Sequence, residues 1–180
     1  MWWIPIVILV LIGLWVMATY NKLVVLRERV KNAVGQIAAQ IESRWDALSS
    51  LIQATKKYSA HEAQVLEDLT KMRSGISKNS SVQDIESDMS KFQDLMNKIN
   101  VVVEAYPDLK ASNVYQTAME SVDKYENNVR QARMMYNDIV TKFNSAIMVF
   151  PSSIVASLFS FKEKDYFENT ESKKDMPSWE

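Results

Sequence analysis

An apolar run near the amino terminus constrains this chain more than any other feature. Residues 2–18 contain no charged side chain, and the chain then continues without proline or glycine as far as Gly35. Extended to Tyr20, the run would form a helix about 28 Å long, which matches the hydrocarbon core of a bilayer. The sequence therefore predicts a transmembrane anchor over residues 1–20 that continues into the first soluble helix as one rod.

Aromatic residues stand at both ends of this run, where the two membrane interfaces are expected. They are Trp2 and Trp3 at one end and Trp15 and Tyr20 at the other. Such rings can contact hydrocarbon and lipid headgroups at the same time. The alternative is a cleaved signal peptide, which has basic residues before its apolar run and a small-x-small site after it. This sequence shows neither feature, which favours a retained anchor.

Basic residues follow the anchor and predict its orientation. They are Lys22, Arg27, Arg29, Lys31 and Arg44. The other flank of the anchor has only the amino terminus, so the positive-inside rule favours a cytoplasmic carboxy-terminal domain.

Glycine and cysteine usage argues against several kinds of active site. The three glycines, Gly13, Gly35 and Gly75, are too far apart for a dinucleotide-binding loop, a phosphate-binding loop or a nucleophile elbow. There is no cysteine and one histidine, so a thiolate nucleophile and an ordinary zinc site are excluded. We expect a protein that is not an enzyme and that uses no cofactor, metal or small-molecule substrate.

The remaining charged residues do not change this expectation. His61 and Glu62 fit the first turn of a helix, where the acid complements the helix amino terminus, better than they fit a catalytic or metal site. The net charge is −1, with 21 basic and 22 acidic residues. A nucleic-acid-binding protein would carry a concentrated basic surface, so no nucleic-acid partner is expected.

Apolar periodicity predicts an all-α fold with four helices, over about residues 20–58, 60–74, 82–105 and 112–150. In the fourth helix, apolar residues recur every three or four positions from Tyr115 to Phe150 without a miss. A capping box at Ser59 begins the second helix, and Ser81, followed three residues later by Asp84, offers an N-terminal cap for the third. Prolines at positions 107 and 151 end the third and fourth helices.

Two topologies are consistent with these helices. A reversal between Gly75 and Ser81 makes an antiparallel four-helix bundle over residues 21–161, in which Phe150 returns to the membrane end. Collinear second and third helices would instead make three long rods and leave Phe150 far from the bilayer. The aromatic-rich segment after Phe150 suits a membrane interface or a neighbouring protein, which favours the four-helix bundle.

This apolar segment, residues 152–161 with their flanks, is the main candidate interface. Its members are Phe150, Pro151, Ile154, Val155, Leu158, Phe159, Phe161, Tyr166 and Phe167. Residues 162–180 are mostly polar and are predicted to form a disordered tail.

Polar residues on the helices give two further candidates. Arg133, Tyr136, Asn137 and Asn144 on the fourth helix, with Asn32, Gln36 and Gln40 on the first, predict a cross-helix ladder of hydrogen bonds; a polar groove for a peptide or a subunit is the alternative. Tyr106, Pro107 and Asp108 are predicted to form a turn, with an exposed interaction loop as the alternative.

Several short motifs, in their order along the chain, resemble the bacterial LemA family. They include Tyr20-Asn21-x-Leu23, Arg27-x-Arg29-Val30-x-Asn32-Ala33, Glu104-Ala105-Tyr106-Pro107-Asp108-Leu109-Lys110, Ala132-Arg133-x-x-Tyr136-Asn137 and Phe150-Pro151-Ser152. The resemblance implies a membrane-attached bundle of long antiparallel helices, with no established enzymatic activity, in a bacterial inner membrane.

Two functions are consistent with these features. The first is a structural protein that self-associates as a homo-oligomer or scaffolds other membrane proteins. The second is membrane remodelling, or regulation of a membrane enzyme, through the apolar segment after Phe150. Both have the lipid bilayer as a partner.

Overall fold

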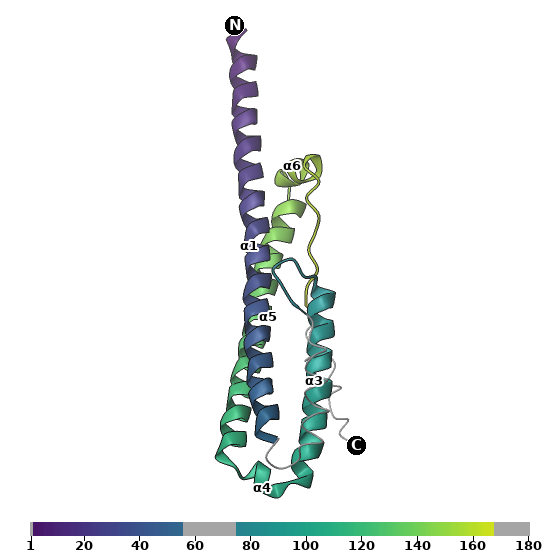
Figure 1. Ribbon diagram of the computed structural model, residues 1–180. Helices are drawn as coiled ribbons and strands as arrows, with labels where there is room; N and C mark the ends of the chain where they lie inside the picture. The colour runs from purple at the N-terminus through teal and green to yellow at the C-terminus, as the bar shows by residue number, and fades with distance from the viewer. Residues whose placement is uncertain (1, 56–74, 168–180) are drawn as a thin grey trace, which may run out of the picture.

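All regular structure in the described residues is helical, as predicted. The structure is a computed structural model that describes residues 2–55 and 75–167. Its helices are α1 (Trp3–Thr55), α3 (Val82–Ala105), α4 (Pro107–Lys110), α5 (Asn113–Met148) and α6 (Ser152–Leu158), shown in Figure 1. Residues 60–74, predicted to be helical, lie outside the described ranges. The four-helix arrangement therefore stays a prediction.

Helix α1 is one uninterrupted rod with two different surfaces. Residues 2–15 are exposed on every side, and from Leu23 onward one side of the helix is buried. Within the described residues, α1 is the one unbent helix that is long and apolar enough to cross a membrane. None of its most apolar 18-residue stretch is buried by the rest of the protein. The absence of a helix breaker between the two halves explains why they form one helix.

Helix α5 runs antiparallel to α1, and the two make the main helix interface (Figure 1). The apolar stripes predicted from the three- and four-residue spacing face each other in the core. From α1 they include Val30, Ile37, Ile41, Leu48 and Ile52, and from α5 they include Val122, Val129, Tyr136, Val140 and Phe143. Burial of these stripes, more than helix propensity, holds such long helices together.

Helix α3 runs in the same direction as α1 (Figure 1). The predicted N-terminal cap begins it and is a full capping box, because the Ser81 hydroxyl accepts from the Asp84 N–H while the Asp84 carboxylate accepts from the Ser81 N–H. The helix ends at Ala105, and Tyr106, just before Pro107, is its C-cap residue, whose N–H donates to the Val103 carbonyl. The next residues, predicted as a turn or loop, form the short helix α4, for which Pro107 supplies the first residue.

The segment after α5 turns back on the bundle. Helix α5 ends at Met148, and α6 is bent from it by 91°. After α6, Ser160 adopts a left-handed conformation with φ of 55°, and residues 161–167 run without helix along α5. Within the predicted disordered tail, residues 162–167 lie along α5, whose side chains bind the backbone of Lys164 and Phe167. Residues 168–180 lie outside the described part of the chain.

Candidate functional site

The corner between α5 and α6 exposes several large apolar side chains. Phe150 is 75% exposed, Leu158 is 72% exposed and Ile154 is 58% exposed. Val155 and Ala156, on the other side of α6, are buried against the bundle. Helix α6 is thus amphipathic, and its apolar outer face has no covering element in the described residues.

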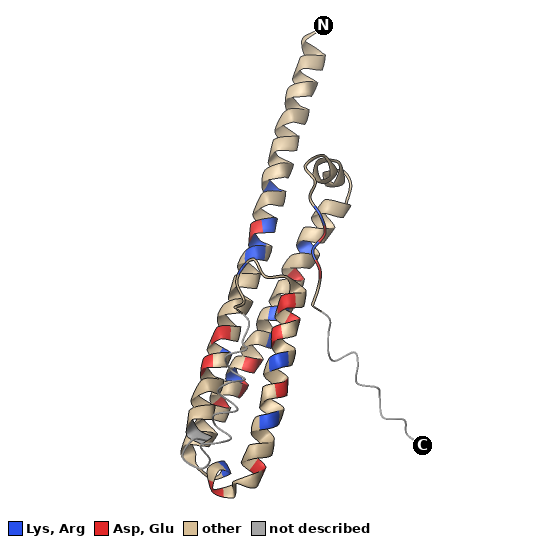
Figure 2. Cartoon of the chain, turned by 45° about the vertical axis from the view of Figure 1, so that its right-hand side comes forward, with Lys and Arg blue, Asp and Glu red and all other residues tan. Residues whose placement is uncertain are grey.

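This corner lies beside α1 at the end of the apolar run. The Tyr20 ring centroid is 4.6 Å from that of Phe159 and 5.9 Å from that of Phe161. Figure 2 shows that α6 and the apolar end of α1 carry no Lys, Arg, Asp or Glu, whereas charged residues are spread along the rest of the rod. The chain's two most apolar regions therefore meet at one level of the molecule.

Residues 161–167, which we call the strap, are held on α5 by two asparagine side chains. Asn144 Nδ2 donates to the Lys164 carbonyl and Asn144 Oδ1 accepts from the Lys164 N–H, both at 2.9 Å. Asn137 makes the same pair of hydrogen bonds with Phe167, both at 3.0 Å. Each amide uses its donor and its acceptor on the backbone of one residue, so this binding does not depend on the strap's side chains.

The spacing of the two asparagines fits an extended chain. Seven residues of α-helix advance about 10.5 Å, and three residues of extended backbone advance about 10 Å. Asn137 and Asn144 therefore meet strap residues three apart without distortion of either segment.

Aromatic side chains fasten both ends of the strap. The Phe167 ring is buried, with its centroid 4.9 Å from that of Tyr136 and 5.0 Å from the Arg133 guanidinium carbon. The half-buried Phe161 ring lies 5.4 Å from the Arg27 guanidinium carbon and 6.4 Å, centroid to centroid, from Phe143. Between these ends the strap side chains are exposed.

The Tyr136 hydroxyl makes stability depend on pH. It donates to the Asp165 carbonyl at 3.0 Å, and burial together with the negative charge of the Asp165 side chain raises the pKa of Tyr136 to about 12. An unfolded tyrosine has a pKa of about 10. The stabilisation from the neutral phenol is therefore complete below about pH 10 and is lost as the pH rises toward 12.

We expect the urea midpoint of the wild type to fall between pH 10 and 12 more steeply than that of Tyr136→Phe, which cannot ionise. Both proteins should be measured by far-UV circular dichroism in the same detergent. Parallel pH profiles would show that Tyr136 titrates in the folded state as it does in the unfolded state.

A buried ionic cluster joins α1, α3 and α5 near the middle of the rod. Arg44 Nη1 lies 2.6 Å from Glu126 Oε2, Arg44 Nη2 lies 3.7 Å from Asp88 Oδ2, and Trp45 Nε1 donates to Asp88 at 3.0 Å. The guanidinium carbon also lies 3.9 Å from the Phe92 ring centroid. Arg44 and Asp88 are 1% and 0% exposed, so these two members of the cluster are buried where the three helices meet.

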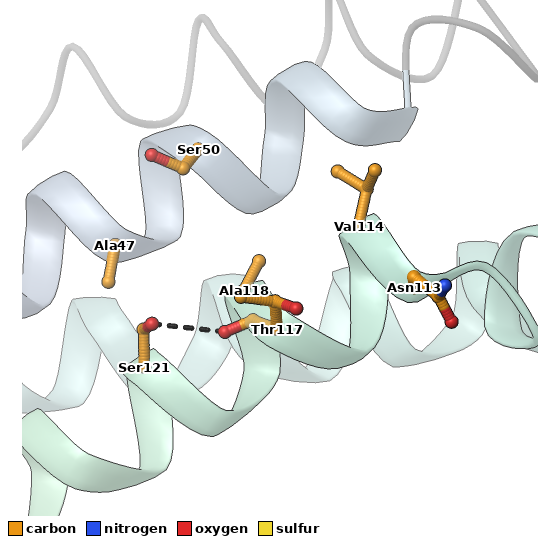
Figure 3. Close-up of a pocket in the computed structure, with 7 residues that line it drawn as sticks. All are labelled: Ala47, Ser50, Asn113, Val114, Thr117, Ala118 and Ser121. Atoms are coloured by element: carbon orange, nitrogen blue, oxygen red, sulfur yellow. Dashed lines mark hydrogen bonds between the residues drawn. The ribbon is translucent and has the colours of Figure 1, made fainter.

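A shallow groove lies between α1 and α5 toward the α4 end of the rod (Figure 3). It has a volume of about 420 Å³ and is lined by Ala47, Ser50, Asn113, Val114, Thr117, Ala118 and Ser121. The Ser121 hydroxyl donates to the Thr117 carbonyl within α5 at 3.0 Å. The groove therefore offers small side chains and few polar groups, which suits helix packing better than chemistry.

Comparison with known proteins shows the family of this chain. A model of the LemA family matches residues 33–180. The chain belongs to the LemA family. This confirms the resemblance found in the sequence motifs, and the match begins after the apolar run at the start of α1.

Individual relatives are distant. Protein LemA of Metamycoplasma hominis is 26% identical over 152 residues, which cover 84% of this chain and 69% of the relative. Magnetosome proteins MamQ 1 and MamQ 2 of Paramagnetospirillum magneticum are each 27% identical over 77 residues, which cover 43% of this chain and 28% of each relative. This chain thus matches less than a third of the length of either magnetosome protein.

The predicted interface of this LemA-family chain divides into two groups. Phe150, Pro151, Ile154, Leu158, Phe159 and Tyr166 are exposed, whereas Val155, Phe161 and Phe167 are buried or half-buried in contacts within the chain. Of the predicted anchor aromatics, Trp2, Trp3 and Trp15 are exposed, and Tyr20 packs against the α6 corner. At the other end of the rod, Pro107 and Asp108 are exposed and Tyr106 is half-buried.

The predicted cross-helix ladder is wrong for three of its members, because Tyr136, Asn137 and Asn144 bond to the strap. Asn137 and Asn144 bind the strap, as in the alternative of a polar groove that receives a peptide, except that the peptide belongs to the same chain. Gln40 does take part in a cross-helix hydrogen bond, which its Oε1 accepts from Asn128 at 3.0 Å. The sequence singled out neither Asn128 nor Lys164. His61 and Glu62 lie outside the described residues.

Among the described residues, no group of three histidine, cysteine, aspartate or glutamate side chains is placed to hold a metal ion.

Proposed function

We propose that this LemA-family chain is a membrane-anchored structural protein that holds a helical rod upright on the bilayer. In this proposal α1 crosses the membrane and α6 lies on its surface, so the rod is fixed at two points. The rod then presents its sides and its α4 end to further copies or to other membrane proteins. The observation that carries the proposal is the right-angled corner, whose exposed apolar face lies beside Tyr20.

The chemistry of the corner supports contact with lipid. A helix perpendicular to α5 lies parallel to the membrane plane if α1 and α5 stand along the membrane normal. Burial of one leucine, isoleucine or phenylalanine side chain in an apolar phase contributes about 1.5–3 kcal/mol. Phe150, Ile154 and Leu158 point such side chains outward without a charged neighbour on α6, which is the pattern of an interfacial helix.

The continuity of α1 supports a scaffolding role. From Tyr20 to Thr55 the helix is unbroken, which corresponds to a rod about 50 Å long. A continuous helix buried against α5 transmits the position of its membrane end to its far end without a hinge. Self-association through the rod, and a four-helix bundle completed by residues 60–74, belong to this proposal.

Fluorescence in liposomes tests the two-point attachment. The chain has no cysteine, so a single cysteine at Leu158 can carry an environment-sensitive dye, with Lys98→Cys on the exposed side of α3 as the matched control. We expect lipid-borne quenchers to quench the dye at position 158 and to leave the dye at position 98 unaffected. The proposal is contradicted if lipid-borne quenchers quench neither dye and an aqueous quencher quenches both dyes equally.

Membrane remodelling, or regulation of a membrane enzyme, is the second candidate function, and the exposed α6 face is the observation that favours it. Shallow insertion of α6 would then change the shape or leakage of liposomes at high protein density. The triple variant Ile154→Ser, Leu158→Ser and Phe159→Ser should abolish that change. Crosslinking of the same protein in membranes tests self-association separately from membrane remodelling. Recovery of the monomer only would contradict self-association.

The proposed location is the bacterial inner membrane with the rod in the cytoplasm. The basic residues just after the apolar run support this orientation. Paired reporter fusions after Glu180, active on opposite sides of the membrane, test it directly.

A further inference from the structure

A second cavity, distinct from the α6 corner, lies between α1, the start of α3 and the strap. Its volume is about 330 Å³. Four basic side chains from three separate parts of the chain line it, and they are Arg27 and Lys31 of α1, Lys78 of the loop before α3, and Lys164 of the strap. Asp165 is the one acidic residue in the lining, and Val30, Val34 and Val82 supply apolar surface.

The basic residues of this cavity are only partly neutralised by the protein. Glu28 lies 3.5 Å from Lys31 Nζ and 4.0 Å from Arg27 Nε, and these three side chains are about half exposed. Within the described ranges, neither Lys78 nor Lys164 has a carboxylate within 4 Å of its ammonium group. The nearby Asp84 carboxylate is engaged by the N–H and hydroxyl of Ser81.

The structure holds two of these basic residues at the cavity through their backbone and Cβ positions. Asn144 fixes the Lys164 backbone through two hydrogen bonds of 2.9 Å. Lys78 is placed by its close approach to α1, where its Cβ lies 3.5 Å from the position that a Cβ on Gly35 would take. Convergence of like charges is unfavourable unless an anion offsets it, and this chain has an overall net charge of only −1.

We propose that this cavity binds a phosphate-type anion, either free phosphate or a phosphomonoester. Lys78 of the loop before α3 and Lys164 of the strap contact its oxygens through charge-assisted hydrogen bonds, and Arg27 and Lys31 add positive charge from α1. Ser81 and Val82, at the amino-terminal end of α3, also line the cavity, and the capping box there already places the Asp84 carboxylate against the Ser81 N–H. The strap thus completes a binding site as well as covering α5.

The position of the cavity along α1 favours a soluble anion over a lipid headgroup. Arg27 and Lys31 follow Tyr20 by seven and eleven residues on one continuous helix, or about 10 and 16 Å. The polar layer on each side of a bilayer is only about 5–8 Å thick. A lipid phosphate beside Tyr20 would therefore not reach the far side of the cavity.

Phosphate binding to the full chain tests this site. The protein should be placed in phosphatidylcholine liposomes and titrated with inorganic phosphate at constant ionic strength, with calorimetry and the thermal unfolding midpoint as readouts. We expect saturable binding that Lys78→Gln with Lys164→Gln weakens by about tenfold or more. The matched control, Lys98→Gln with Lys110→Gln, removes the same charge from exposed positions on α3 and α4 and should bind like the wild type.

Liposomes that contain phosphatidic acid distinguish the two sources of the phosphoryl group. A midpoint shift caused by this lipid alone, and lost in the Lys78 and Lys164 variant, would assign the site to a headgroup. Absence of saturable phosphate binding together with absence of a lipid effect would overturn the proposal, as would equal weakening in the control variant. The dye at position 158 reports α6 separately, so failure of this site and failure of the membrane proposal are distinguishable.

Discussion

Replacement of Arg44 by Met is expected to lower the free energy of unfolding by about 3–5 kcal/mol, because it removes the cation that lies 3.7 Å from a buried carboxylate. Asp88 is 0% exposed and accepts from Trp45 Nε1, so its charge cannot move into water without disturbing the core. Glu126, the other partner, is 40% exposed and can be solvated, so most of the loss comes from Asp88. Urea unfolding followed by far-UV circular dichroism in detergent measures it.

A second substitution separates the charge effect from lost side-chain contacts. Arg44→Met with Asp88→Asn removes both charges and keeps an acceptor for Trp45, so we expect it to recover a large part of the lost stability. Arg29→Met, on an exposed face of the same helix, is the control and should change the free energy of unfolding by less than about 0.5 kcal/mol. If Arg44→Met behaves like this control, the cluster does not hold the three helices together.

Release of the strap is the second large effect, and we expect it from Asn137→Leu combined with Asn144→Leu. The double variant removes four hydrogen bonds to the strap backbone, each worth about 0.5–1.5 kcal/mol. The opening is local, because residues 162–166 of the strap are exposed and Phe167 is its one fully buried side chain. Hydrogen exchange should show loss of protection at the Lys164 and Phe167 amides by about a hundredfold, with little change in the helices.

Asn128→Leu is the matched control for this experiment, since Asn128 bonds to Gln40 and not to the strap. It should leave the exchange of Lys164 and Phe167 unchanged. Unchanged protection in the double variant would mean that the rings of Phe161 and Phe167 hold the strap without the asparagines. Because Lys164 lines the proposed phosphate site, release of the strap should also weaken phosphate binding.

Sequence patterns predicted the long helices well because their causes are local. Apolar residues at three- and four-residue spacing bury one face of a helix wherever that face finds a partner, and α5 shows this from Tyr115 to Ile147. The Ser81 capping box likewise depends on residues three apart. The return of α5 to Tyr20 was also predicted, because helix length and an apolar segment after a proline together limit where the chain can go.

The strap could not be predicted in this way. Residues 162–165 are polar and lack a period, and their position depends on Asn137 and Asn144, more than fifteen residues earlier in the chain. An asparagine on a helix has many acceptable partners, so its identity alone favours a neighbouring helix as much as a strap. The available signal was the spacing of seven residues between the two asparagines. This spacing indicates a binding site only when an extended segment is known to lie beside the helix.

The apolar run at the start of α1 and the periodic stripes determined by themselves that the chain forms one continuous amino-terminal helix and further long helices with one apolar face each. That α5 runs antiparallel to α1 was decided by the tertiary structure. Only the tertiary structure decided which polar groups meet, namely Arg44 with Asp88, Asn144 with Lys164, and Lys78 with Lys164 around one cavity. The physical reason is that apolar burial is non-directional and can be read from composition and period. Hydrogen bonds and ion pairs depend on distance and angle, which segments far apart in sequence acquire only when they are folded together.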